Sequence, residues 1–145
     1  MIRKKNIAGF SLVEILVVIS IIAILSALFI SQTTGIAQQK ARDSKRRADL
    51  ETIRAALEIY RSDCGSYPAS LGTSLVGTGT CSGNTYLNSV PVDPGRNAYR
   101  YTPNGTSAYA VCARLEVGAS SLCSSSPCTG NCGTGGACTY SLCNP

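Results

Sequence analysis

The sequence contains no histidine and no tryptophan, and only two phenylalanines. Without histidine, the chain lacks the side chain that most often serves as a general base or a metal ligand. It also has no cysteine pair in C-x-x-C spacing, which structural zinc sites commonly use, and no glycine-rich phosphate-binding motif. Because no activated catalytic group can be identified, we expect that this protein is not an enzyme.

Acidic residues are missing from the end of the chain. The last one is Glu116, and residues 117–145 carry no charged side chain at all. Calcium sites need several oxygen ligands, carboxylates above all, and this region has no carboxylate side chain. Calcium binding is therefore in doubt, and we expect no cofactor. The net charge of +5 does not indicate nucleic acid binding either, because residues 62–145 contain three basic and three acidic side chains.

Eight cysteines are present, and all of them follow residue 63. An even number of cysteines in a short span predicts disulfides and an oxidising compartment. Zinc binding and free thiols are the alternatives, which the absence of histidine and the irregular spacing disfavour. The pairing cannot be read from the spacing. The disulfide candidates are Cys64, Cys81, Cys112, Cys123, Cys128, Cys132, Cys138 and Cys143.

One long hydrophobic run extends from Phe10 to Ile30. At ~1.5 Å per residue a helix of this length crosses a bilayer core of ~30 Å, so we predict a transmembrane helix. Basic residues flank the run on both sides, and the count alone would place the N-terminus outside. A disulfide-linked domain belongs outside, however, and we therefore predict a cytoplasmic N-terminus. An uncleaved signal anchor is one interpretation of this arrangement.

A single acid, Glu14, interrupts the start of that hydrophobic run. An unpaired carboxylate costs about 2 to 3 kcal/mol near a bilayer centre and less near its edge, so such residues usually have a function and a partner. A tolerated acid at the membrane edge is the alternative.

The helix is expected to continue beyond the hydrophobic run, because residues 38–62 contain neither proline nor glycine. Apolar side chains recur with helical spacing at Leu50, Ile53, Leu57 and Tyr60. We predict one helix from Phe10 to about Asp63, weakest near Gly35. A coiled coil would explain the same spacing, but the repeat is short, and packing against the chain's own domain is preferred.

The remaining chain predicts a small β-sheet. Gly65 and Pro68 end the helix, and residues 97–102 and 107–116 flank an Asn-Gly pair at 104–105 in the pattern of a hairpin. The face that carries Tyr99, Tyr101, Tyr109, Val111, Ala113 and Leu115 should cover the apolar stripe of the helix. Residues 138–142 are a candidate third strand, in a C-terminal lobe held together by cysteines.

The segment KKNIAGFSLVEILVVISIIAIL resembles the N-terminus of the type IV pilin and type II secretion pseudopilin superfamily. The resemblance implies that a prepilin peptidase cleaves after Gly9 and that the new N-terminal residue, Phe10, is N-methylated. It further implies that Glu14 of an incoming subunit pairs with the Phe10 amine of its neighbour during assembly. Such a partner for Glu14 exists only after cleavage.

The middle of the chain is similar to the same superfamily. LETIRAALEIYRSDCGSYPASL resembles the end of the long helix and the entry to the loop that follows it, and YLNSVPVDPGRNAYRYTPNGTSAYAV resembles the loop and first strands of major pseudopilins and related pilins. The resemblance implies an α+β, pilin-like fold: one long N-terminal helix packed on a small antiparallel sheet, with a disulfide-rich C-terminal region. The expected segments are a leader (1–9), a transmembrane and assembly helix (10–30), its amphipathic continuation (31–63), an αβ-loop (64–95), a β-hairpin (96–116) and a cysteine-rich lobe (117–145).

The implied function is that of a structural subunit, a pilin or major pseudopilin, in a helical homo-oligomeric filament. The implied partners are the prepilin peptidase, the membrane and an inner-membrane assembly platform, and nucleic acid is not favoured. The subunit would be a single-pass membrane protein before assembly and part of a pilus or pseudopilus afterwards. A minor subunit at the filament tip, acting as an adhesion or binding module, is the alternative.

Overall fold

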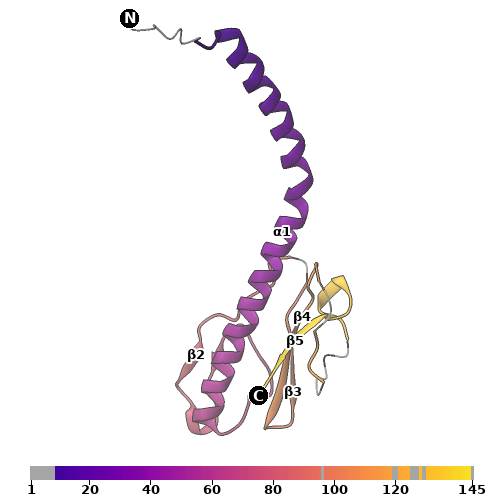
Figure 1. Ribbon diagram of the computed structural model, residues 1–145. Helices are drawn as coiled ribbons and strands as arrows, with labels where there is room; N and C mark the ends of the chain where they lie inside the picture. Colours follow the sequence, from indigo (N-terminus) through magenta and orange to yellow (C-terminus); the bar gives the residue numbers. More distant parts are fainter. Residues whose placement is uncertain (1–8, 96, 119–120, 125–127, 129, 145) are drawn as a thin grey trace, which may run out of the picture. The chain divides into compact units, whose positions relative to one another are not determined.

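The computed structural model describes residues 9–95, 97–118, 121–124, 128 and 130–144, without the side chains of residues 29–34. The chain divides into two compact units, residues 1–37 and 38–145. The only helix of more than one turn in the described residues, α1 (Leu12–Cys64), begins in the first unit and ends in the second (Figure 1). The single helix predicted from Phe10 to about Asp63 is confirmed, although it begins at Leu12, and Gly35 does not interrupt it.

The helix ends where the sequence predicts. Gly65 follows α1 with a φ of 79°, and its N–H donates to the carbonyl oxygen of Arg61 at 2.8 Å. A positive φ at the first residue after a helix favours glycine, because other residues meet a steric penalty there. The chain then turns away from the helix axis into the segment predicted as the αβ-loop.

The second unit contains a three-stranded antiparallel sheet of β3 (Arg100–Asn104), β4 (Ala108–Ala113) and β5 (Tyr140–Cys143), in that order. Tyr101 lies opposite Val111, which in turn lies opposite Leu142. The predicted hairpin and third strand are therefore confirmed. The strands are shorter than the sequence pattern suggested, because Tyr99 and Leu115 lie just outside them.

The face of the sheet that looks toward α1 forms the main core. Leu50, Ile53 and Leu57 of the helix are fully buried in it. Tyr109, Val111 and Ala113 of β4 belong to the same cluster. The apolar stripe of the helix thus packs on its own domain, which confirms the preferred interpretation of the helical spacing over a coiled coil.

The αβ-loop is more ordered than its Gly, Ser and Thr content indicated. It contains a short antiparallel pair, β1 (Leu75–Val76) and β2 (Thr85–Leu87), and a 3-10 turn, η1 (Gly79–Cys81). The Cys64–Cys81 disulfide attaches this turn to the end of α1. The rings of Tyr60 and Tyr86 meet edge to face, with centroids 5.1 Å apart, and close the loop over the helix.

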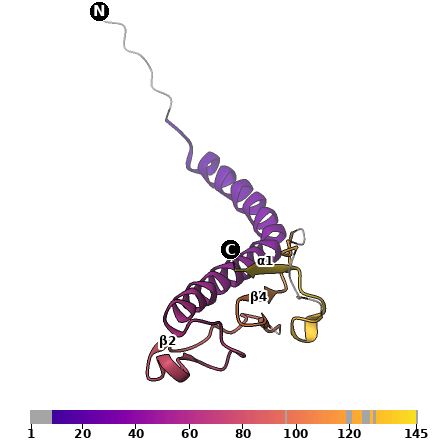
Figure 2. The ribbon, with the colours of Figure 1, turned by 90° about the horizontal axis from the view of Figure 1, so that it is seen from below.

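The C-terminal lobe packs on the other face of the sheet. Ala110 and Cys112 of β4 point into a second small core that is otherwise made of cysteines: Cys128, Cys132, Cys138 and, partly buried, Cys143. The lobe includes a 3-10 turn, η2 (Gly133–Gly135). Figure 1 and Figure 2 both show η2 well separated from the αβ-loop, so the lobe and the loop are distinct layers around the sheet and helix.

Candidate assembly and processing site

Gly9 and Phe10 precede the helix and are exposed, Phe10 to 80%. The helix begins directly afterwards: the backbone N–H groups of Glu14 and Ile15 donate to the carbonyl oxygen of Ser11 at 3.1 and 3.3 Å. The predicted cleavage point therefore lies in non-helical, exposed backbone, where a peptidase can bind an extended segment. Residues 1–8 of the predicted leader lie outside the described residues.

Glu14 lies in the first turn of α1, where the partial positive charge of a helix N-terminus favours an acid. It is the only charged residue between Lys5 and Lys40. Its side chain is exposed and makes no hydrogen bond or ion pair with any residue that the structure describes. The geometry thus leaves this carboxylate available to a cation from another molecule.

The apolar side chains around Glu14 are also exposed. Twelve of them, from Leu12 to Leu28, are between 47% and 81% accessible, namely Leu12, Val13, Ile15, Leu16, Val17, Val18, Ile19, Ile21, Ile22, Ile24, Leu25 and Leu28. A continuous apolar surface of this kind marks a membrane or protein contact. Across the described helices, none combines the length and hydrophobicity that a membrane crossing needs. The predicted span is therefore not confirmed, and the side chains of Phe29 and Ile30 at its end are not described.

A buried charge network joins the second half of α1 to two distant parts of the chain. Arg46 is fully buried and binds Asp93, in the loop before β3, through hydrogen bonds of 2.7 Å from Nε and 3.1 Å from Nη2. Its Nη1 donates to Asp43 at 2.7 Å and to Glu116 at 2.8 Å. The guanidinium of Arg46 therefore donates hydrogen bonds to three carboxylates. The hydrogen bonds to Asp93 contribute most to raising the pKa of Arg46.

Glu116, just after β4, completes the network with a second arginine. Arg42 binds both of its carboxylate oxygens, at 2.8 and 2.5 Å. Hydrogen bonds from Arg42, and then from Arg46, lower the pKa of Glu116 to about 2. The backbone N–H groups of Glu116 and Val117 donate in turn to Asp43. The start of the C-terminal lobe is thereby tied to the helix by charge-assisted hydrogen bonds, which are stronger than neutral ones.

Tyrosines tie the other end of the domain together. Tyr67 and Tyr109 both donate to Glu58 of α1, at distances between 3.0 and 3.1 Å, and Tyr101 donates to the carbonyl oxygen of Pro68 at 2.7 Å. Burial raises the pKa of Tyr101 to about 12.

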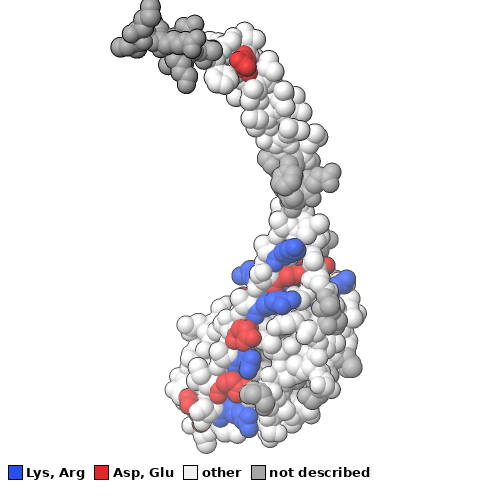
Figure 3. Space-filling model, in the orientation of Figure 1, with Lys and Arg blue, Asp and Glu red and all other residues white. Residues whose placement is uncertain are grey.

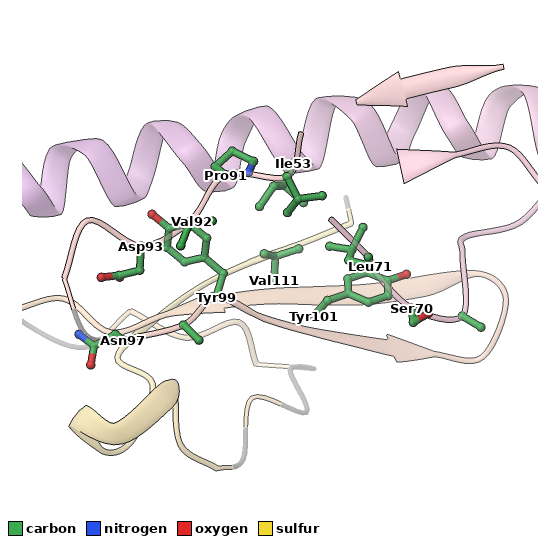
Figure 4. A pocket seen from close by; sticks show the side chains of 14 residues that line it. Ile53, Ser70, Leu71, Pro91, Val92, Asp93, Asn97, Tyr99, Tyr101 and Val111 are labelled. Atoms are coloured by element: carbon green, nitrogen blue, oxygen red, sulfur yellow. The ribbon is translucent and has the colours of Figure 1, made fainter. Parts of the chain in front are cut away.

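A hollow of about 380 Å³ remains between the αβ-loop and the sheet, with Val92, Tyr99 and Tyr101 among its walls (Figure 4).

All eight cysteines form disulfides, as the sequence predicted, and the structure adds the pairing that the sequence left open. The pairs are Cys64–Cys81, Cys112–Cys128, Cys123–Cys143 and Cys132–Cys138. The last three hold the C-terminal lobe together and join it to β4 and β5. Within the described residues there is no group of three or more side chains suited to a metal ion.

Sequence reasoning missed the Arg46 network, because it considered the basic residues after the hydrophobic run only as charges that flank a membrane segment. A signal was present. Asp43 and Arg46 continue the spacing of three and four residues that Leu50 and Ile53 begin, so they lie on the buried stripe of the helix. A charged pair on an apolar stripe indicates a buried ion pair with partners elsewhere in the chain.

Family models match both parts of the chain. The model of the prokaryotic N-terminal methylation motif matches residues 4–30, and the model of type II secretion system protein G matches residues 34–119, more than half of the chain. The chain belongs to the type II secretion system protein G family. The α+β pilin-like fold and the resemblance seen in the sequence are thereby confirmed, and the protein is a structural subunit of the pseudopilin type.

Individual relatives agree with this assignment. The chain is 33% identical to the type II secretion system core protein G of Pseudomonas aeruginosa, over 72% of this chain and 79% of the relative. It is 30% identical to the core protein G of Aeromonas hydrophila, over 71% and 78%. A shorter match, 38% identical over 46% of this chain and 50% of the relative, is to the type IV wide pilus major component PilA4 of Thermus thermophilus. No solved structure matches.

Proposed function

We propose that this protein is the subunit of a helical homopolymer in a type II secretion system, assembled after a prepilin peptidase removes residues 1–9. The observation that carries the proposal is the combination of a methylation motif at residues 4–30 with a protein G domain at residues 34–119 in one chain. Glu14 supports it, because this acid has no partner among the described residues and lies on an exposed apolar helix, and both features suit a contact between subunits.

The proposed mechanism uses the new N-terminus that cleavage creates. Removing residues 1–9 frees the amine of Phe10, which is N-methylated and remains cationic. That amine supplies a charge partner for Glu14, which has none among the described residues of the single chain. Pairing Glu14 of an incoming subunit with the Phe10 amine of its neighbour removes an unpaired acid from an apolar environment, which favours transfer from membrane to polymer.

The proposed topology follows from the disulfides and from the Arg46 network. Disulfides persist in oxidising compartments, which supports a location of residues 64–145 outside the cytoplasm. Arg42 and Arg46 contact Glu116 and Asp93 of that domain, so the basic residues after the apolar run lie in the same compartment as the cysteines. The N-terminus is then cytoplasmic while the subunit waits in the membrane, within reach of the peptidase and the assembly platform.

Deleting the chromosomal copy separates a secretion polymer from a surface pilus. Under the proposal, the deletion abolishes export of the proteins that depend on type II secretion and leaves surface pili unchanged, and a plasmid copy restores export. Loss of pili with normal secretion would instead place the subunit in a type IV pilus, a possibility favoured by its match to the Thermus thermophilus pilus component.

A further inference from the structure

Arg100 and Arg114 lie near each other on the face of the sheet that carries the C-terminal lobe. Arg100 of β3 stands opposite Cys112 of β4, whose side chain belongs to the second core, and Arg114 follows two residues after Cys112. The two arginines therefore occupy diagonal positions on one face, at which residues are roughly 7 to 8 Å apart. Arg100 is exposed and Arg114 is half-buried. Both side chains are long enough to reach one small ligand between them.

A small loop of the lobe, residues 130–138, packs against these side chains. The Cys132–Cys138 disulfide closes the loop. The backbone N–H groups of Cys132 and Cys138 donate to the carbonyl oxygens of Gly136 and Gly130, at 3.0 and 3.3 Å. The two arms of the loop thus run antiparallel, and Gly130 and Gly136 lie on the same face of it.

These two glycines make room for the guanidinium groups. A Cβ at Gly130 would lie 2.7 Å from Nη1 of Arg100, and a Cβ at Gly136 would lie 2.7 Å from Nη1 of Arg114. Gly130 and Gly136 also have positive φ values, of 132° and 109°, which favour glycine. The two guanidinium groups therefore lie in a cradle of loop backbone that other residues would fill, and the cradle keeps two positive charges close together.

Neither arginine has an acid that neutralises its charge. All eight acidic residues belong to the described part of the chain, and none of them forms an ion pair or hydrogen bond with Arg100 or Arg114. Glu116, the acid nearest to Arg114 in the sequence, is bound by Arg42 and Arg46. Neighbouring like charges are unfavourable, so the pair gains when an anion binds between them.

The cations of α1 differ from this pair. Arg42, Lys45, Arg46 and Arg54 each bind an acid. Figure 3 shows basic and acidic side chains interspersed along the helix. The lobe offers no such partner, because the sequence has no charged residue after Glu116. An anion for Arg100 and Arg114 must therefore come from another molecule.

The charge and the geometry of the pair favour a phosphate group over a carboxylate. A carboxylate has one charge and two coplanar oxygens, which a single planar guanidinium already matches. A phosphate monoester carries a charge of about −1.5 to −2 and three acceptor oxygens that point in different directions, so two guanidinium groups can both donate to it over about 2.8 Å. The carboxamide of Asn97 borders Gly135 beside Nη1 of Arg114 and adds a neutral donor to the site.

We infer that Arg100 and Arg114 form a binding site for a phosphate group, which belongs either to free phosphate or to a lipid headgroup. The site goes beyond the proposed function, because it exists in the single subunit and does not require a polymer. It gives the C-terminal lobe a binding role, which explains why disulfides hold the lobe in a fixed conformation although it has little apolar core.

A phosphate titration of the full-length protein, in micelles of an uncharged detergent at constant ionic strength, tests the site. Inorganic phosphate should shift the NMR signals of the Nε–H groups of Arg100 and Arg114, and the shifts should saturate. Arg100→Gln and Arg114→Gln should each weaken the affinity by about tenfold or more, because each removes charge-assisted hydrogen bonds to the anion. Arg54→Gln is the matched control and should keep the parental affinity, because it makes the same change on α1.

Two lipids added to the micelles distinguish the sources of the phosphate. Lysophosphatidic acid, a phosphate monoester, should shift the same two signals, whereas lysophosphatidylcholine, whose phosphate carries a cationic group, should not. Tighter binding of lysophosphatidic acid than of inorganic phosphate assigns a lipid headgroup, and the reverse order assigns free phosphate. Both orders support the site.

Three results would overturn the site: shifts that do not saturate in the parent protein, equal responses to the two lipids, or equal weakening by Arg54→Gln and Arg100→Gln. The titration of the parent needs no variant, so a folding defect in a variant does not decide the question. All variants should keep four disulfides and the parental melting temperature without phosphate. Loss of the site would leave the proposed function intact.

Discussion

Arg46 and Asp93 form a fully buried ion pair, with neither side chain accessible to solvent, although 47 positions separate them in the sequence. The pair joins α1 to the loop that leads into β3. Since a buried charge is tolerated only when it is paired and hydrogen-bonded, the pair also fixes where this loop lies on the helix.

Replacing Arg46 by methionine should therefore destabilise the domain strongly. The variant leaves Asp93 buried without a partner, which costs about 3 to 5 kcal/mol. Lys45→Met is the matched control, because the Lys45 side chain is 59% exposed and its 3.8 Å pair with Asp49 should contribute less than about 1 kcal/mol. Chemical denaturation of the purified proteins measures both. Equal stabilities for the two variants would contradict the importance given to the buried pair.

Acid should weaken the link between the helix and the start of the lobe. The pKa of Glu116 is lowered from an ordinary value of 4.5 to about 2, chiefly by hydrogen bonds from Arg42. A carboxyl with a lowered folded-state pKa contributes its full stability above its unfolded pKa and loses it as pH falls through the folded value. Unfolding free energy should thus fall between pH 4.5 and about 2.

Glu116→Gln provides the comparison for this acid transition, because it keeps the shape of the side chain and removes its titration. The variant should be less stable than the parent near neutral pH, and the difference should shrink toward pH 2. A difference that stays constant across this range would show that the charge on Glu116 contributes nothing to stability.

The disulfides should differ in their resistance to reduction. Cys112 and Cys132 are fully buried, whereas Cys123 and Cys143 are both half-buried. Exchange requires attack by a thiolate on an accessible sulfur, so a soluble thiol should reduce Cys123–Cys143 first. Timed alkylation followed by peptide mass spectrometry gives the order. Earlier reduction of Cys112–Cys128 would mean that the lobe opens before its disulfides are attacked.

The secondary-structure elements could be predicted from the sequence, whereas most contacts that join them could not. The helix, the hairpin and the end of α1 at Gly65 could be predicted, because periodicity, an Asn-Gly turn and a glycine are local signals. The β1–β2 pair was missed, because strands as short as Leu75–Val76 carry no periodicity. Disulfide pairing and the partners of Arg46 depend on how distant segments meet, which no local pattern specifies.

At the N-terminus the sequence was more informative than the geometry. Gly9, Phe10 and Glu14 were singled out by a motif, and the structure adds that the cleavage point is non-helical and that Glu14 lacks a partner among the described residues. Their roles in cleavage, methylation and assembly remain predictions, because each involves a second molecule.

Glu14→Ala tests the assembly role directly. Under the proposed pairing, removing the carboxylate deletes the partner of the Phe10 amine. Polymer recovered by shearing should then fall by about tenfold or more, as expected for loss of a charge-assisted contact in an apolar environment. Cleavage after Gly9 should continue, and the processed subunit should accumulate in the membrane fraction. Parental amounts of polymer from this variant would mean that Glu14 has no part in assembly.

Mass spectrometry of the N-terminal peptide of protein recovered from sheared polymer tests the proposed processing and assembly most directly. We expect a chain that begins at Phe10 and carries an N-methyl group. An intact Met1 in protein found only in the membrane fraction would contradict it.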